Sequence, residues 1–152
     1  MKIRLRLPVL AVAVALLLAG CTDWGSGPER AKRETIVETA LGQVGRPYQY
    51  GGDTPDGFDC SGLVEYSYAE AGVSVPHNTS ALRSAGSHIS LGDARPGDLL
   101  FYRFRGGALH VAIYLGHGKM VHAPASGKQV SVIHTDDHPW PDLFLGAVRM
   151  LR

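Results

Sequence analysis

The chain contains two cysteines, and their surroundings suggest different chemistry for each. Cys21 closes a Leu-Ala-Gly-Cys sequence that follows basic residues and the apolar stretch 9–18. That order is typical of an export signal with a small-residue processing site. An exported protein works where disulfides are permitted, and an unused lone thiol is a liability there. Cys60 is the one thiol left after Cys21, so it is the first candidate for a nucleophile.

Cys60 stands in the segment Asp-Cys-Ser-Gly, where a helix is expected to begin. A cysteine in the first turn of a helix faces unpaired backbone N–H groups and the positive end of the helix dipole, and both favour the thiolate. The same N–H groups are suited to hold the oxyanion that forms when a carbonyl is attacked. Gly62 would leave room for a substrate backbone to approach. The alternative is a structural cysteine on a buried helix face.

A cysteine nucleophile needs a base, and the chain offers seven histidines. His110 lies in an alternating segment, 110–115, which the turn 116–118 connects to a second segment containing His122. If that turn has three residues, both histidines project from one face of a hairpin. Such a pair predicts one imidazole that takes the thiol proton and a second group that orients it. Two alternatives stay open: partly buried strand histidines, and a zinc site, which no CxxC or HExxH spacing supports.

The N-terminal segment predicts attachment to a membrane. Its Leu-Ala-Gly-Cys ending resembles a bacterial lipobox, in which residues 1–20 are removed and Cys21 receives the lipid anchor. A retained transmembrane anchor is the alternative, but the apolar run is short of the ~20 residues that span a bilayer. Residues 21–29 are expected to be a tether, and residues 30–152 one domain. Asp23 does not directly follow Cys21, which favours the outer membrane, with the domain facing the periplasm.

Charge excludes one class of partner. The signal carries three of the 15 Lys and Arg residues, so 12 basic residues stand against 14 acidic ones in the mature chain. A chain near neutrality is not expected to bind nucleic acid. It has no coiled-coil pattern, so a monomer is expected.

Helix signals come first along the chain and strand signals follow. Three helices are expected, over residues 30–44, 60–72 and 79–86, the second capped by Asp59 and the third by Asn78. Strands are expected at 99–104, 109–115, 119–123, 130–133 and 145–151. This order predicts an α+β domain with an antiparallel sheet.

Six motifs in order resemble those of the NlpC-type peptidases, which are compact papain-like cysteine peptidases of the bacterial cell wall. They are GRPY at 45–48, YGG at 50–52, GFDCSGLV at 57–64, PGDL at 96–99, HVAIYLG at 110–116 and HA at 122–123. The resemblance covers about residues 30–152. It implies a papain-like fold, with N-terminal helices packed on a central antiparallel β-sheet.

The resemblance also implies roles for the matching residues. Cys60 would be the nucleophile, His110 the base and later the acid, and His122 the residue that orients His110. No metal or organic cofactor is implied.

Three further positions match residues of the substrate or oxyanion region. Tyr48 matches a tyrosine whose hydroxyl lies close to the thiol, while Asp59 and Ser61 match groove-lining positions in some members. Simpler interpretations are a packing aromatic for Tyr48, a helix cap for Asp59 and a polar turn residue for Ser61. At position 77 the chain carries histidine where many relatives carry arginine. His77 is thus expected to alter the substrate preference, and the alternative is a surface histidine. The remaining histidines are expected to be exposed: His88, His117, His134 and His138.

The function implied is hydrolysis of amide bonds in peptidoglycan peptides. Most of the family cuts between D-glutamate and the diamino acid of the stem, whereas small lipoprotein members cut the cross-link between diaminopimelate and D-alanine. The lipobox, the short tether and the absence of wall-binding modules favour the cross-link. Two alternatives are a murein-binding lipoprotein without catalysis and an acyltransferase on the same scaffold. An intact Cys-His-His set argues against the first, and only an acceptor experiment separates the second.

Overall fold

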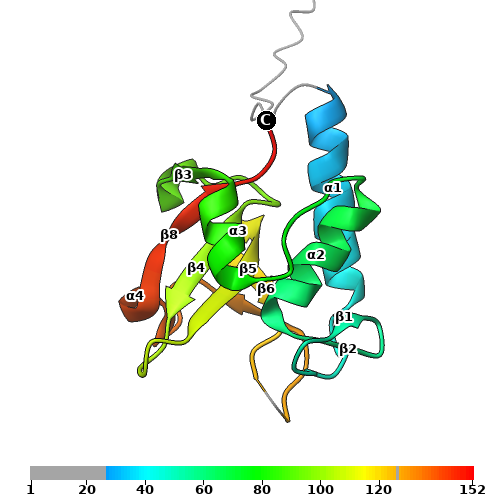
Figure 1. The fold of residues 1–152 in the computed structure, drawn as a ribbon. Helices are drawn as coiled ribbons and strands as arrows, with labels where there is room; N and C mark the ends of the chain where they lie inside the picture. Colours follow the sequence, from blue (N-terminus) through cyan, green and yellow to red (C-terminus); the bar gives the residue numbers. More distant parts are fainter. Residues whose placement is uncertain (1–26, 126) are drawn as a thin grey trace, which may run out of the picture.

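The computed structural model describes residues 27–125 and 127–152. The expected signal, the expected lipidation site Cys21 and the first part of the expected tether lie outside these residues. The described elements follow the expected order, helices before strands (Figure 1). They are α1 (Gly27–Gly42), β1 (Asp53–Thr54), β2 (Gly57–Phe58), α2 (Cys60–Glu70), α3 (Thr79–Ala85), β3 (Ser87–Ile89), the 3₁₀ turn η1 (Leu91–Asp93), β4 (Leu99–Arg103), β5 (Leu109–Gly116), β6 (Lys119–His122), β7 (Ser131–His134), α4 (Trp140–Leu143) and β8 (Phe144–Arg149). None of the helices within 27–125 and 127–152 is both long and apolar enough to cross a bilayer.

The centre of the fold is a six-stranded antiparallel sheet in the order β3-β8-β4-β5-β6-β7. Strands β4, β5 and β6 are consecutive neighbours, whereas β8 returns to pair on the other side of β4. A small separate pairing of β1 with β2 lies beside the start of α2 (Figure 1). The α+β class and the papain-like arrangement expected from the sequence are confirmed.

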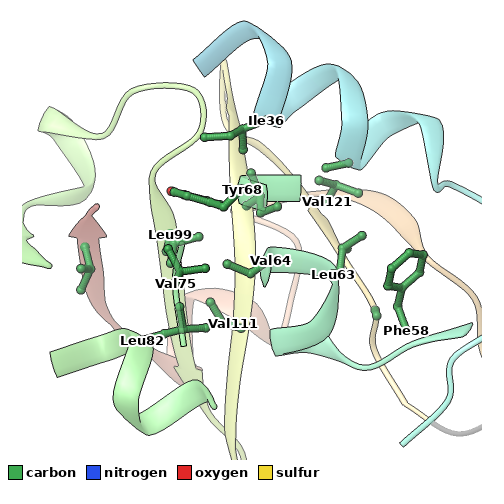
Figure 2. Packing of buried hydrophobic residues seen from close by; sticks show 14 of the residues in the cluster. Ile36, Phe58, Leu63, Val64, Tyr68, Val75, Leu82, Leu99, Val111 and Val121 are labelled. Atoms are coloured by element: carbon green, nitrogen blue, oxygen red, sulfur yellow. The ribbon is translucent and has the colours of Figure 1, made fainter. Parts of the chain in front are cut away.

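Side-chain alternation along the strands divides the sheet into two faces. Odd-numbered residues such as Leu99, Val111 and Val121 meet Val64 and Tyr68 of α2 in the main core (Figure 2). Even-numbered residues of β4, β5 and β6 pack on the opposite face in a second, smaller cluster, which also contains Ala147 of β8 and residues of α4. Because the side-chain period of a strand is two, His110 and His122 belong by parity to this second face.

A buried ion-pair network fixes α1 to the sheet. Arg33 and Asp98 are both fully buried, and Arg33 Nη1 lies 2.9 Å from Asp98 Oδ1. The same nitrogen donates to the Pro96 carbonyl at 2.9 Å. Arg149 of β8 reaches the other carboxylate oxygen, with Nη2 2.7 Å from Oδ2. One buried carboxylate therefore joins the first helix to the last strand.

The ends of α1 differ from those expected. The helix begins at Gly27 rather than at residue 30, so the last three residues of the expected tether are helical. Pro28 is tolerated in a first helical turn, and Glu29 pairs with Arg33 one turn on. The helix ends at Gly42 because the N–H groups of Gln43 and Val44 bond to carbonyls three residues back, as in a tighter turn.

The hairpin between β5 and β6 also differs from the three-residue turn that was expected. Gly116 pairs with Lys119, leaving a two-residue turn whose residues His117 and Gly118 have φ of 51° and 68°. Two positive φ angles are typical of the primed turns that join twisted strands. The register shifts between Tyr114 and Gly116, which is a β-bulge. The bulge adds the residue that the shorter turn lacks, so Tyr114 pairs with Met120 and even-numbered residues still share a face.

Candidate active site

Cys60 is the first residue of α2, as the sequence predicts, and its thiol is free. Asp59 is the N-cap, with extended backbone and a carboxylate Oδ1 that accepts the Gly62 N–H at 2.7 Å. The Cys60 sulfur is partly exposed and lies 3.5 Å from Thr79 Oγ1 at the start of α3. The thiol therefore stands at a helix start beside a second helix.

Gly62 has a different role from the one expected. A Cβ built at this position would lie 1.9 Å from the Gly52 carbonyl oxygen and 3.1 Å from the Asp53 Cα. The space is filled by the chain itself rather than left for substrate. Gly62 is required because the residues before β1 pack directly on the first turn of α2.

His110 and His122 are brought together as the hairpin parity predicts. His110 Nε2 lies 2.9 Å from His122 Nδ1, and each residue is only 3% exposed. Burial lowers the pKa of both imidazoles, and the neighbouring His122 lowers that of His110 further. Both rings are therefore neutral near pH 7. Since Nε2 of His110 is occupied by His122, its Nδ1 is the nitrogen left to exchange a proton.

Trp140 covers this histidine pair and was not predicted as a site residue. Its ring centroid lies 5.7 Å from that of His110 and 5.0 Å from that of His122. Phe104 lies 5.6 Å from His110 on the same side and 5.8 Å from Trp140. The aromatic wall excludes water from the imidazoles and supplies part of the desolvation that lowers their pKa values. Proline on both sides of Trp140 is the only local signal, and it does not indicate where the ring points.

A groove of about 640 Å³ opens over Cys60. Its lining includes four of the predicted residues, Tyr48, Asp59, Cys60 and Ser61, together with Thr79 and Leu109. Leu109 directly precedes His110 in β5, so the histidine-bearing strand begins at the groove that holds the thiol. His110 and His122 are not among the lining residues. No hydrogen bond joins Cys60 to His110 within the part of the chain that the structure describes.

Tyr48 lies close enough to the thiol to interact with it electrostatically. Burial raises the pKa of Tyr48, and negative charge on Cys60, Asp59 and Tyr50 raises it further. Its hydroxyl is therefore a proton donor rather than an anion at neutral pH. Tyr50, by contrast, stands at the groove with 89% of its surface exposed.

Asp59 acts as a helix cap and also holds the loop before it. Besides Gly62, its Oδ1 accepts the Ser61 hydroxyl at 3.1 Å, and Oδ2 accepts the Gly51 N–H at 2.9 Å. Asp59 is therefore a helix cap, Ser61 lies in the first turn of α2, and both also line the groove.

His77 is not merely the surface histidine of the simpler expectation. Its side chain is only 27% exposed, lines the groove and places Nε2 3.3 Å from Asp59 Oδ1. No sequence motif around His77 indicates its contact with Asp59. The other four histidines expected to be exposed are exposed: His88, His117, His134 and His138.

Comparison with known proteins identifies the family of the chain. The model of the NlpC/P60 family matches residues 45–149, and the chain belongs to that family. A probable endopeptidase of Mycobacterium tuberculosis is 44% identical over 112 residues, which are 74% of this chain and 28% of the relative. The probable endopeptidase p60 of Listeria monocytogenes is 39% identical over 99 residues, 65% of this chain and 20% of the relative. The chain thus spans about a quarter of the length of these curated relatives.

Solved structures show the same domain. The NlpC/p60 domain of the peptidoglycan hydrolase SagA has a TM-score of 0.68 and 40% identity, covering 78% of this chain and 98% of that one. The peptidoglycan hydrolase RipB from Mycobacterium tuberculosis has a TM-score of 0.72 and 32% identity, covering 89% of this chain and 74% of that one.

Proposed function

We propose that the chain is a cysteine endopeptidase that hydrolyses amide bonds in peptidoglycan peptides. The observation that carries this proposal is one groove that holds the Cys60 thiol at a helix start and is bordered by the strand of a buried histidine pair. Family membership and the names of the relatives, which are endopeptidases and peptidoglycan hydrolases, support the same activity.

In the proposed reaction, His110 Nδ1 takes the Cys60 proton and the sulfur attacks the carbonyl carbon of the scissile amide. The first N–H groups of a helix have no partner within it. The Asp59 carboxylate accepts the N–H of Gly62, so the N–H groups of Cys60 and Ser61 are left to donate hydrogen bonds to the oxyanion. The proton on His110 passes to the leaving amine as the C–N bond breaks. Water then attacks the thioester, His110 accepts its proton, and the acid product leaves with the thiol restored.

The role proposed for His122 follows from the tautomers. For Nδ1 of His110 to accept a proton, the neutral ring must carry its hydrogen on Nε2. That hydrogen can be donated only if His122 Nδ1 is an acceptor, 2.9 Å away. His122 therefore fixes the His110 tautomer and stabilises the imidazolium that forms after proton transfer.

For the bond, we propose the cross-link between diaminopimelate and D-alanine ahead of the D-glutamyl–diamino acid bond, by analogy with small lipoprotein members. We further propose a monomer anchored through lipid on Cys21 to the outer membrane and facing the periplasm. Non-hydrolytic murein binding and acyl transfer are the alternatives.

Defined muropeptides test these proposals together. The full chain in detergent is incubated with a cross-linked dimer and with an uncross-linked stem peptide, with and without an added amine acceptor, and products are resolved by mass spectrometry. The proposal predicts monomers from the dimer, carrying one added water per cleavage. Cleavage of the stem alone would reassign the bond, an acceptor adduct would indicate acyl transfer, and no product from either would favour binding.

A further inference from the structure

A second group of titratable side chains lies beside the groove, outside the Cys-His-His set. It consists of Asp53 in β1, Glu65 in α2 and His77 in the loop before α3. One ligand atom from each lies within 4.8 Å of the others. Three segments that are separated in sequence thus place an imidazole and two carboxylates around one point.

Two of the three distances between these atoms bracket the ligand spacing of a tetrahedral metal ion. His77 Nδ1 lies 3.0 Å from Glu65 Oε2 and 3.8 Å from Asp53 Oδ2. Ligands about 2.0–2.1 Å from a tetrahedral zinc ion stand roughly 3.3 Å apart, between these two distances. Imidazole with carboxylate oxygens is a donor set that zinc accepts, whereas calcium prefers six or more oxygens.

Two further features point to a cation at this position. Glu65 Oε2 is a buried atom of a side chain that is otherwise 37% exposed; it accepts no hydrogen bond from the described residues, and it lies 3.0 Å from His77 Nδ1. A buried carboxylate oxygen without a donor is costly unless a positive charge meets it. In addition, the other ring nitrogen of His77, Nε2, lies 3.3 Å from Asp59 Oδ1. A metal-bound histidine characteristically donates its second N–H to a carboxylate, which fixes the tautomer.

We propose that Asp53, Glu65 and His77 form a zinc site with a fourth position open to water. Bound zinc joins β1, α2 and the approach to α3, and the last two of these contribute residues to the lining of the groove. Through His77 Nε2 it also acts on Asp59, the residue that caps the helix of Cys60. The site is independent of the proposed hydrolysis, because none of its ligands belongs to the Cys60, His110 and His122 set.

Calorimetric titration with Zn²⁺ tests the site. The full chain in detergent carries Cys60→Ala in every sample, so that the active-site thiol cannot act as a ligand. One zinc ion per chain is expected to bind. Replacing a second-shell partner typically weakens metal binding by about 10–100-fold, so losing a ligand in Glu65→Gln or His77→Gln is expected to cost at least that. The matched control is Glu70→Gln, an exposed acid on the same helix, which should bind as tightly as the parent.

Thermal unfolding provides a second readout that does not depend on catalysis. A ligand that binds only the folded chain raises Tm, so zinc should raise it in the Glu70→Gln protein and not in the Glu65→Gln protein. If Glu65→Gln does not fold, Asp53→Asn carries the test, since the Asp53 side chain is 51% exposed and its exchange leaves the core intact. Absence of zinc binding in the parent, or binding that survives all three ligand substitutions, would overturn the proposal.

Discussion

The hydrogen bond between the two buried histidines makes a sharp prediction about His122. In His122→Ala the Nε2–H of His110 loses its acceptor, and with His110 only 3% exposed, bulk water does not replace it. A hydrogen bond to a charged group contributes about 1.5–3 kcal/mol. The imidazolium form of His110 depends on this bond during turnover. At 1.4 kcal/mol per factor of ten, kcat/KM should fall about 10–150-fold.

His122→Asn is the matched variant, because its side-chain carbonyl can accept the same hydrogen bond. It should retain several times the activity of His122→Ala, measured as kcat/KM on one muropeptide at fixed pH. His134→Ala, at an exposed strand histidine of β7, controls for the loss of an imidazole and should match the parent. Equal losses in the Asn and Ala variants would refute the orienting role and point to a charge or metal role for His122.

Three other substitutions test the surroundings of the site. Trp140→Ala admits water to His110 and raises its lowered pKa toward 6.5, so the acid limb of the kcat/KM profile should move to higher pH. Arg33→Leu removes one of the two arginines that pair with the buried Asp98 carboxylate, so the free energy of unfolding in urea should fall, by less than the about 3–5 kcal/mol of a fully unpaired buried charge because Arg149 remains. Gly62→Ala forces a methyl group into the backbone that packs on α2, so both Tm and activity should fall.

Each of these has a control and a contradicting result. Phe144→Leu alters the same sheet face at a ring that packs on Tyr102, and it should leave the pH profile unchanged. An unmoved acid limb in Trp140→Ala would mean that the ring does not set the environment of His110. Arg30→Leu removes an exposed pair of α1, so a loss equal to that of Arg33→Leu would argue against a special cost of the buried charge. A Gly62→Ala protein with normal Tm would contradict the close approach of the Gly52 carbonyl to Gly62.

The parts of the site that the sequence predicts are those fixed by local rules. Asp59 before Cys60 is predictable as a helix cap because the carboxylate of an N-cap residue accepts an N–H group only two or three residues ahead, here that of Gly62. His110 and His122 share a face because strand alternation preserves parity, even though the turn is shorter than expected and a bulge intervenes. Both results depend on short-range geometry, which one sequence is enough to specify.

The remaining features depend on contacts between distant segments. Trp140 contacts the histidines because β8 returns beside β4. The sequence between β7 and β8 has no hydrophobic periodicity that would predict this contact. The strand β3 has three residues and forms by pairing with β8. His77, in the loop before α3, meets Asp59 and Glu65 at the cap and in the body of α2, and Gly62 is explained by Gly52, ten residues away. Tertiary packing, rather than local propensity, determines each of these.

The most direct test of the central claim is digestion of purified peptidoglycan by the full chain in detergent, with Cys60→Ala as the control. Soluble products are resolved by mass spectrometry after equal incubation, and circular dichroism confirms that both proteins are folded. We expect new peptide fragments with the parent chain and none with Cys60→Ala, since Cys60 is partly exposed and its substitution leaves the core intact. Identical product profiles from the two proteins would contradict cysteine-dependent hydrolysis.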